Sequence, residues 1–368
     1  MRSAKKTHAR KPILLGLWYG STAANLACAA LALIATQAQA DGWAVAPDPV
    51  YGGQYNAVGD PSVIRVGDGS YLMFHHCIDV LRDPQGGEVC LARSADGVHW
   101  RYARTDNSAW FVRSRLLIAT IGGWDEAHET PFAVQVGTMI RLYVLGYKGS
   151  GVFSDPPSAG IGMVQSADPL AFPQMGAPIL TPSVPGDAGG ITSPSVVQTD
   201  GGGVLYYTGW SCSMADPACP AREKLTLMAV PLDGAGLPVG VPRPVLADPG
   251  VAWAHGGVSE AEVILGPDGR YYVFFSTLPG SEAGSAQSIG LGVADDPFGP
   301  FTIAADPIIT PEDVTGHWAR GGVLAPAVLI EDGQVRLWFH AFELGADGQI
   351  SKARIGIATH DWPIWPAD

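Results

Sequence analysis

The sequence predicts an all-β chain that folds as a five-bladed β-propeller with four antiparallel strands in each blade. The first observation is a unit of about 62 to 72 residues that occurs five times, long enough for four short strands and their turns. The second is the composition: 47 Gly, 30 Pro and 15% charged residues among 368 favour short strands joined by many turns. Helical repeats would space apolar residues by about 3.6, and no such stretch of useful length follows residue 40.

The repeated unit is a strand, a Gly/Asp turn and a second strand rich in aromatic and β-branched residues, which is a β-hairpin signal. The first copy reads GDPSVIRVGDGSYLMFHH from Gly59, and the fifth reads LAPAVLIEDGQVRLWFHAF from Leu324. Alignment of the five copies places these residues in one position, which we call the column: Asp60, Thr130, Ser193, Glu260 and Ala325. The intervals between them are 70, 63, 67 and 65 residues.

Two further markers support this alignment. A closing segment follows each hairpin, for example RSADGVHW from Arg93 and ATHDWPIW from Ala358. A Gly-Gly pair ends three residues before the column in three copies, in GGITS, GGVSE and GGVLA. The five copies fill residues 41–368, which we therefore interpret as one propeller domain.

The first forty residues have a different character. A basic start leads into an apolar run over residues 23–35 and then into Ala38-Gln39-Ala40. This order is typical of a secretory signal peptide with its cleavage site, so residues 1–40 are predicted to be removed on export. The mature protein is expected to be secreted or periplasmic and free of the membrane, with a retained membrane anchor as the alternative.

Four cysteines remain after this predicted cleavage, and each flanks a loop. Their spacing favours the bridges Cys77–Cys90 and Cys212–Cys219 among three possible connectivities. None has the C-x-x-C spacing of a zinc or redox site, so stapled loops are the interpretation. The net charge of −13, with no basic run in the mature part, argues against nucleic acid as a partner. We expect a monomer.

In a propeller the innermost strand of each blade lines the axis, so the five column residues are expected to converge at one mouth. A charged side chain there needs a partner or a task. Asp60 and Glu260 are the two acids of the column. Two carboxylates on opposite sides of a narrow pocket suit cleavage of a glycosidic bond, one as general acid and the other as general base.

Around these acids the sequence resembles a known group. The segments DPSVI from Asp60 and EAEVI from Glu260 are similar to the motifs of family 43 glycoside hydrolases, which are related to families 32, 62 and 68. Those enzymes are five-bladed propellers with an Asp base in blade one and a Glu acid in blade four. The resemblance implies that Asp60 is the general base and Glu260 the general acid of an inverting hydrolase.

One position departs from the family pattern, which has a second Asp in blade three that tunes the pKa of the acid. This sequence has Ser193 there, and a serine carries no negative charge to raise the pKa of Glu260. Either another acid substitutes or the protein no longer cleaves. Glu129 is the third catalytic candidate for this reason, with Asp125 and Asp187 behind it. Glu262 is the reserve acid.

Further residues are candidates for contact with an oligo- or polysaccharide, because apolar sugar faces stack on aromatic rings and polar groups bind hydroxyls. For each of them, packing within or between blades is the competing interpretation. They are His255, Arg320, Trp124, Trp210, Trp253, Trp318 and the column residue Ser193. Of His75 and His76, one is expected to face inward without a chemical role.

No cluster of residues in the sequence demands a metal, and no cofactor is expected. Related enzymes sometimes hold calcium through a channel histidine, which makes His128 and His317 the residues to inspect. Three functions compete with the release of arabinofuranosyl or xylosyl units. They are glycan binding without catalysis, action on fructosyl units, and a sialidase-like activity suggested by the Asp-box-like segment 94–100. The last requires six blades and an arginine triad, which the sequence does not provide.

Overall fold

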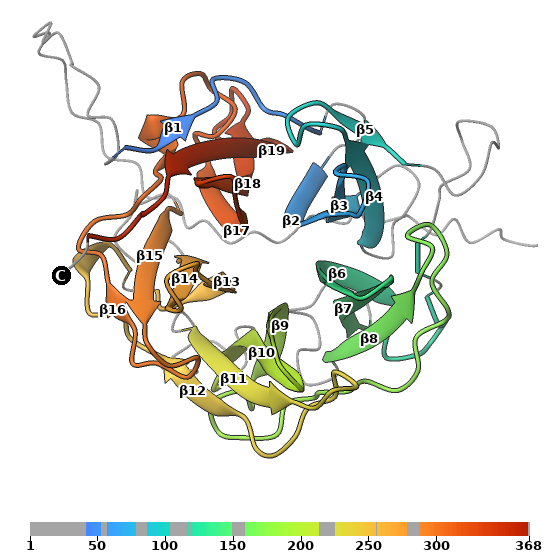
Figure 1. The fold of residues 1–368 in the computed structure, drawn as a ribbon. Helices are drawn as coiled ribbons and strands as arrows, with labels where there is room; N and C mark the ends of the chain where they lie inside the picture. The colour runs from blue at the N-terminus through green and yellow to red at the C-terminus, as the bar shows by residue number, and fades with distance from the viewer. Residues whose placement is uncertain are drawn as a thin grey trace, which may run out of the picture. The chain divides into compact units, whose positions relative to one another are not determined.

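The structure is a computed structural model, and the description covers residues 42–52, 57–78, 87–103, 116–117, 119–148, 159–212, 225–254, 256–277 and 287–366. The predicted signal peptide lies outside these residues. The described strands form five antiparallel sheets arranged around a common axis, and β2, β6, β9, β13 and β17 are innermost (Figure 1). The predicted fold class, an all-β five-bladed propeller, is confirmed. None of the helices in the described residues is long and apolar enough to cross a membrane.

The blades follow one another along the chain. Blade one contains β2 (Ala57–Arg65), β3 (Tyr71–Ile78), β4 (Glu88–Ser94) and β5 (Trp100–Tyr102). Blade two contains β6 (Ala127–Val136), β7 (Met139–Tyr147) and β8 (Gly160–Ser166). Blade three contains β9 (Gly190–Thr199), β10 (Gly202–Trp210), β11 (Thr226–Leu232) and β12 (Arg243–Leu246). Blade four contains β13 (Ser259–Leu265), β14 (Tyr271–Ser276), β15 (Ile289–Ala294) and β16 (Thr302–Ile303). Blade five contains β17 (Gly322–Glu331), β18 (Gln334–Leu344) and β19 (Ile350–Asp361), together with β1 (Ala44–Val45).

Two blades differ from the simple repeat. Blade two has three strands among the described residues, and a single antiparallel bridge between Ile161 and Leu180 lies beside its third strand. Blade five takes its outer strand from the first described strand, β1, because Ala44 and Val45 pair with Thr359 and Ala358 of β19. This pairing joins the first and last described strands and closes the ring of blades, which the sequence analysis did not predict.

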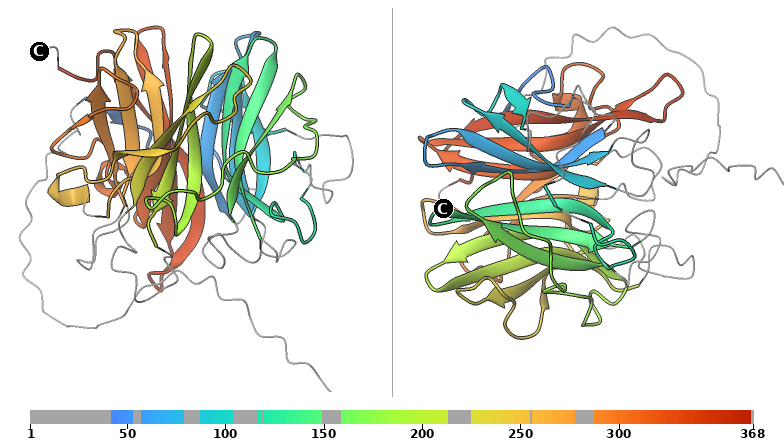
Figure 2. Two further views of the ribbon diagram at one scale, coloured as in Figure 1. Left: turned by 90° about the horizontal axis from the view of Figure 1, so that it is seen from below. Right: turned by 90° about the vertical axis from the view of Figure 1, so that its right-hand side faces the viewer.

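The core lies between adjacent blades. One cluster of buried side chains combines Phe274 of blade four with Leu337 and Phe339 of blade five, and all three are fully buried. Because side chains alternate along a strand, each blade presents one apolar row to the blade before it and one to the blade after it. The blades are therefore packed face to face around the axis (Figure 2).

Hydrogen bonds between innermost strands repeat around the axis. In three blades the side chain two residues after the column accepts the backbone N–H three residues after the column of the next blade. These bonds join Ala133 N to Ser62 Oγ (2.9 Å), Val263 N to Ser195 Oγ (3.1 Å) and Val328 N to Glu262 Oε2 (3.0 Å). Glu262, the reserve acid, thus occupies a position that serine fills in two other blades, and its carboxyl group links blades four and five.

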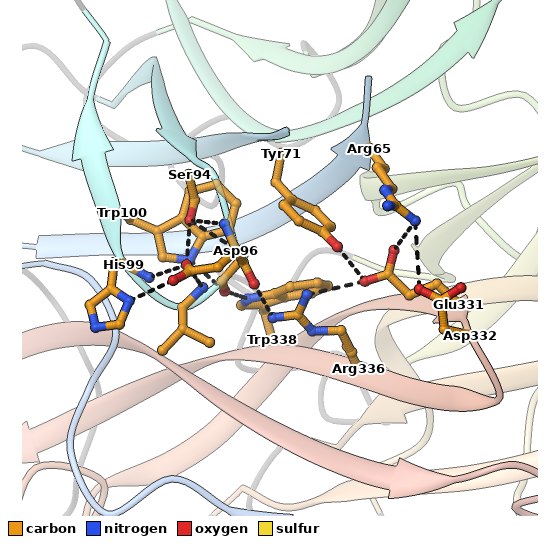
Figure 3. A network of polar contacts seen from close by, with 12 residues as sticks. Arg65, Tyr71, Ser94, Asp96, His99, Trp100, Glu331, Asp332, Arg336 and Trp338 are labelled. Atoms are coloured by element: carbon orange, nitrogen blue, oxygen red, sulfur yellow. Dashed lines mark hydrogen bonds and ion pairs between the residues drawn. The ribbon is translucent and has the colours of Figure 1, made fainter. Parts of the chain in front are cut away.

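A polar network closes the seam between blades five and one at the hairpin-turn end of the strands (Figure 3). The Tyr71 hydroxyl donates to Glu331 at 2.5 Å, and Arg336 donates to the same carboxylate at 3.1 Å. Arg336 also donates to the carbonyl of Asp96 at 2.6 Å. Asp96 belongs to the Asp-box-like segment, which is therefore a turn at this seam. In a five-bladed ring that turn gives no support to the sialidase-like interpretation.

The predicted bridge Cys77–Cys90 is confirmed and joins β3 to β4. Cys212 is also in a disulfide. Its predicted partner Cys219 lies outside the described residues, so the second pairing stays a prediction.

Replacement of Glu262 is expected to change how stability depends on pH. Burial raises the pKa of Glu262 to about 8, although the Val328 N–H opposes this shift. When the pKa of a carboxyl group is raised in the folded state, the free energy of unfolding falls as the pH rises from the pKa of the unfolded state toward that of the folded state. Glu262→Gln keeps an acceptor for Val328 without an ionisable group, so it is expected to match the wild type at about pH 5 and exceed its stability at about pH 8.

The measurement is the free energy of unfolding by chemical denaturation at both pH values. Glu312→Gln, the same change at an exposed glutamate, is the control. If the free energy of unfolding of Glu262→Gln depends on pH as that of the wild type does, the pKa of Glu262 is not raised in the folded state.

Candidate active site

All five column residues have a left-handed backbone conformation. Their φ angles lie between 44° and 53°, and each interrupts the pairing of the innermost strand with its neighbour as a bulge. A non-glycine residue in this conformation costs about 1–2 kcal/mol, and a bulge redirects the side chain. The alignment made from sequence therefore corresponds to one backbone feature repeated five times.

The residue that follows the column explains part of this geometry. In four copies it is a proline, which has no N–H and so gives up no ladder hydrogen bond inside a bulge. These prolines are Pro61, Pro131, Pro194 and Pro326. The fifth copy has Ala261 after Glu260.

Neighbouring blades hold the column by its backbone. Ser193 N–H donates to Thr130 Oγ1 at 3.2 Å, so blades two and three join directly at the column. Glu260 N–H donates to Thr208 Oγ1 of blade three at 3.0 Å. Ala325 N–H contacts Ser276 Oγ of blade four at 3.5 Å. The column residues of blades two to five are therefore fixed relative to one another.

Asp60 lies between two histidines from different blades. Its Oδ2 is 3.5 Å from Nδ1 of His76, and its Oδ1 is 3.8 Å from Nδ1 of His340. Burial favours the neutral acid, but hydrogen bonding and charge from His340 and His76 outweigh it and hold the pKa of Asp60 well below its usual range. Asp60 is therefore ionised at neutral pH, as a general base must be.

Two glycines make room for these rings. A β-carbon at Gly59 would collide with the ring of His340, and a β-carbon at Gly87 would collide with Nε2 of His76. Both histidines therefore approach Asp60 over bare backbone. Substitution of either glycine would displace the ring that it accommodates.

Glu260 has the opposite protonation. Burial, and then the negative charge of Asp60, raise its pKa to about 8. Ser276 donates its hydroxyl proton to Oε2 of Glu260 at 2.8 Å. Glu260 is therefore protonated at neutral pH and able to donate, as a general acid must. Burial is the largest cause of this shift, and the charge of Glu129, the substitute acid named from the sequence, raises the pKa of Glu260 by less than the charge of Asp60 does.

Glu129 reaches the same region from blade two. Its Oε1 accepts the Tyr147 hydroxyl at 2.5 Å and is 3.7 Å from Nε2 of His76. Burial raises the pKa of Glu129, and its charge adds less to the pKa of Glu260 than Asp60 does. Glu129 is thus near both catalytic candidates, as an acid whose closest partners are Tyr147 and His76.

Asp187 and Asp125, the other possible substitutes for the blade-three acid, have partners elsewhere. Asp187 accepts the Tyr207 hydroxyl at 2.7 Å and the backbone N–H groups of Ser183 and Val184. Asp125 is buried, with Oδ2 3.8 Å from Nε2 of His128. Both serve local contacts, so neither substitutes for the missing blade-three carboxylate.

Three of the four tryptophans are part of the blade packing. Their indole N–H groups donate to outer backbone carbonyls: Trp124 to Gly176 (3.0 Å), Trp253 to Ala305 (3.1 Å) and Trp318 to Pro47 (2.9 Å). Trp253 and Trp318 also stack on Phe275 and Phe339 at ring-centroid distances of 5.6 and 6.0 Å. Trp318 is 8% exposed, which leaves little of its ring for a sugar, whereas Trp124 and Trp253 are half-buried and their contact with a sugar stays a prediction.

The remaining sugar-binding candidates lie in different places. Trp210 is 1% exposed at the end of β10, so it too belongs to the core. Ser193 is buried in the column, and its hydroxyl donates to Thr192 Oγ1 at 3.3 Å. Arg320 is exposed, two residues before β17. His255 lies outside the described residues.

The contacts of His76 and His340 with Asp60 were not predicted from the sequence. On the second strands, His76 pairs with Gly59 and His340 is opposite Leu324, so both lie one residue from the column in register. The signal was present as the ends MFHH and WFHAF of the first and fifth repeats. We expected the inward histidine to have no chemical role, but His76 contacts both Asp60 and Glu129, whereas His75 packs against the Tyr51 ring at 5.0 Å.

The metal and pocket features of the described residues give no second candidate site. Among the described residues, no group of three or more His, Cys, Asp or Glu side chains is arranged to hold a metal ion. His317 is exposed, and His128 faces Asp125. A depression of about 700 Å³, lined by Tyr71, Glu331 and others, lies at the opposite end of the strands from the column. Its main charged groups already pair with one another (Figure 3).

The fold is similar to that of solved glycoside hydrolases, although no family model and no curated protein matches the chain. A thermostable family-43 glycoside hydrolase is 17% identical with a TM-score of 0.62, over 83% of this chain and 90% of that one. An endo-arabinase from Bacteroides thetaiotaomicron is 14% identical with a TM-score of 0.58, over 87% of this chain and 97% of that one. An arabinanase from Bacillus subtilis is 15% identical with a TM-score of 0.52, over 82% and 93%. At these identities the likeness establishes the five-bladed fold, as the resemblance in the motifs implied.

The left-handed conformation of the column can be tested at Ala325, which has no chemical role. Glycine adopts positive φ without steric cost, so Ala325→Gly is expected to leave stability unchanged or raise it by up to about 1 kcal/mol. The control is Ala327→Gly, two residues further along β17 in the regular ladder, which is expected to lose about 1 kcal/mol. Denaturant unfolding measures both. Equal losses in the two variants would contradict the backbone assignment.

Proposed function

We propose that the chain is a glycoside hydrolase that uses Asp60 as general base and Glu260 as general acid. The observation that carries the proposal is the opposite displacement of two carboxyl pKa values within one ring of column residues. Pairs of acids whose surroundings separate their protonation states are the usual basis of acid–base catalysis near neutral pH. The similarity of the fold to solved glycoside hydrolases supports the same conclusion.

In the proposed reaction a water molecule attacks the anomeric carbon while the bond to the leaving oxygen breaks. Asp60 accepts a proton from the water, and Glu260 gives its proton to the leaving oxygen. The products are a free sugar of inverted configuration and an alcohol, and both carboxyl groups then return to their starting protonation through solvent. The working state, with Asp60 ionised and Glu260 protonated, persists up to about pH 8.

The substrate is proposed to be an oligo- or polysaccharide with arabinofuranosyl or xylosyl units. The support is the motif resemblance together with the printed names of similar structures, which include an endo-arabinase and an endo-1,4-β-xylanase. Secretion or a periplasmic location is proposed from residues 1–40. The bridge Cys77–Cys90 is consistent with an oxidising compartment. A monomer is proposed as well.

The second candidate is a propeller that binds glycans without cleaving them. Ser193, in place of the blade-three Asp of the family pattern, favours it. The burial of Trp210 and Trp318, which are 1% and 8% exposed, weighs against it, because a binding site without catalysis would need exposed stacking platforms. Action on fructosyl units is compatible with the same two acids and differs only in the substrate.

Asp60→Asn and Glu260→Gln are each expected to lower kcat/KM on aryl arabinofuranosides or xylosides about 10²–10⁴-fold, because each removes one proton-transfer group. Glu262→Gln, which alters a neighbouring acid in an inter-blade bond, is the matched control and should retain wild-type turnover at pH 6–7. Hydrolysis of a panel of aryl glycosides, fructosides included, measures this. Equal turnover in all four proteins contradicts the assignment, and tight glycan binding without turnover favours the second candidate.

A further inference from the structure

His76 lies between two carboxyl groups that belong to different blades. Its Nδ1 is 3.5 Å from Asp60 Oδ2 in blade one, and its Nε2 is 3.7 Å from Glu129 Oε1 in blade two. The His76 side chain is 11% exposed. One ring therefore presents a nitrogen to each acid across the seam between the blades.

The titratable groups that face His76 or its two acids lie on four strands, β2, β6, β7 and β18. Asp60 of β2 and Glu129 of β6 face the ring directly. Behind them, His340 of β18 lies 3.8 Å from Asp60, and the Tyr147 hydroxyl of β7 donates to Glu129. The neighbour His75 turns its ring to Tyr51.

The balance of these charges favours an imidazolium. Burial alone would neutralise the ring, but the charges of Glu129 and Asp60 prevail and raise the pKa of His76. In this form both ring nitrogens carry a proton, so the ring can donate toward both acids at once.

We propose that His76 is a positioning residue of the active site: a protonated bridge that fixes the general base Asp60 to Glu129 and keeps Asp60 ionised. The inference rests on the proposed function. It also assigns Glu129 a role that the sequence did not suggest. Glu129 holds His76 in place, and its charge has only a small effect on the pKa of Glu260.

The surrounding chain holds the ring in this place. Gly87 leaves the space that Nε2 occupies, and the next residue along β3, Cys77, is bonded to Cys90 of β4. The disulfide thus fixes the two strands on which the ring rests. Second-sphere groups of this kind place a catalytic carboxylate within the narrow tolerance that proton transfer needs.

The first test is kinetic. His76→Gln keeps a polar side chain without a positive charge, so kcat is expected to fall about tenfold or more with little change in KM. The acidic limb of the kcat/KM profile is expected to move up by about one pH unit, because Asp60 loses one of the two histidines that lower its pKa. His99→Gln is the matched control, because His99 pairs with Asp96 at 2.7 Å on the hairpin-turn face (Figure 3) and should leave both quantities unchanged.

The second test needs no turnover. The ring ¹⁵N resonances of His76, assigned by their absence in His76→Gln, are titrated in the wild type, Glu129→Gln and Asp60→Asn. Each substitution is expected to lower the pKa of His76, by about one unit or more, because each removes one of the two carboxylates. An unchanged His76 pKa in both variants overturns the bridge, as does a His76→Gln enzyme with the wild-type pH profile. If the wild type cleaves no glycoside, the proposed function fails, and with it the positioning role, while the titration still decides whether the bridge exists.

Discussion

A left-handed bulge at the start of each innermost strand is the constraint on which the site depends. Five non-glycine residues adopt it, and in blades three to five a hydroxyl group of the preceding blade accepts the backbone N–H of the bulged residue. An ordinary strand would direct successive side chains to alternate faces of the sheet, into the packing between blades. The bulge breaks this alternation at one residue per blade and leaves its side chain available at the end of the axis.

The two acids of the column have pKa values shifted in opposite directions. Asp60 has two histidines beside it, whereas Glu260 has a serine hydroxyl and the charge of Asp60. Burial acts on both carboxyl groups, so the difference comes from the two histidines placed near only one of them. The two protonation states that the proposed reaction needs therefore arise with Ser193 in the position where the family pattern has a carboxylate.

The repeat predicted the number of blades and the column, because both follow from the turn chemistry of the hairpins. The spacing of the cysteines predicted the bridge Cys77–Cys90. The alignment located all five bulged residues, although nothing in it indicated positive φ. The partners of Asp60 were missed because they depend on the register of a second strand and on space left by Gly59 and Gly87. The burial of Trp210 and Trp318 was not predicted because a position near a strand end does not reveal that a ring packs against its own blade. Closure by β1 was not predicted because its two residues precede the first hairpin and belong to none of the three markers of the repeat.

The most direct test of this account is the titration of the Glu260 carboxyl group, followed by isotope-edited infrared or ¹³C spectroscopy in wild type and Asp60→Asn. The account predicts a pKa of about 8 in the wild type and a lower value in the variant, because the variant lacks the nearby negative charge. An ordinary value near 4.5 in both proteins would contradict it, since the two acids would then lie in separate, solvated surroundings.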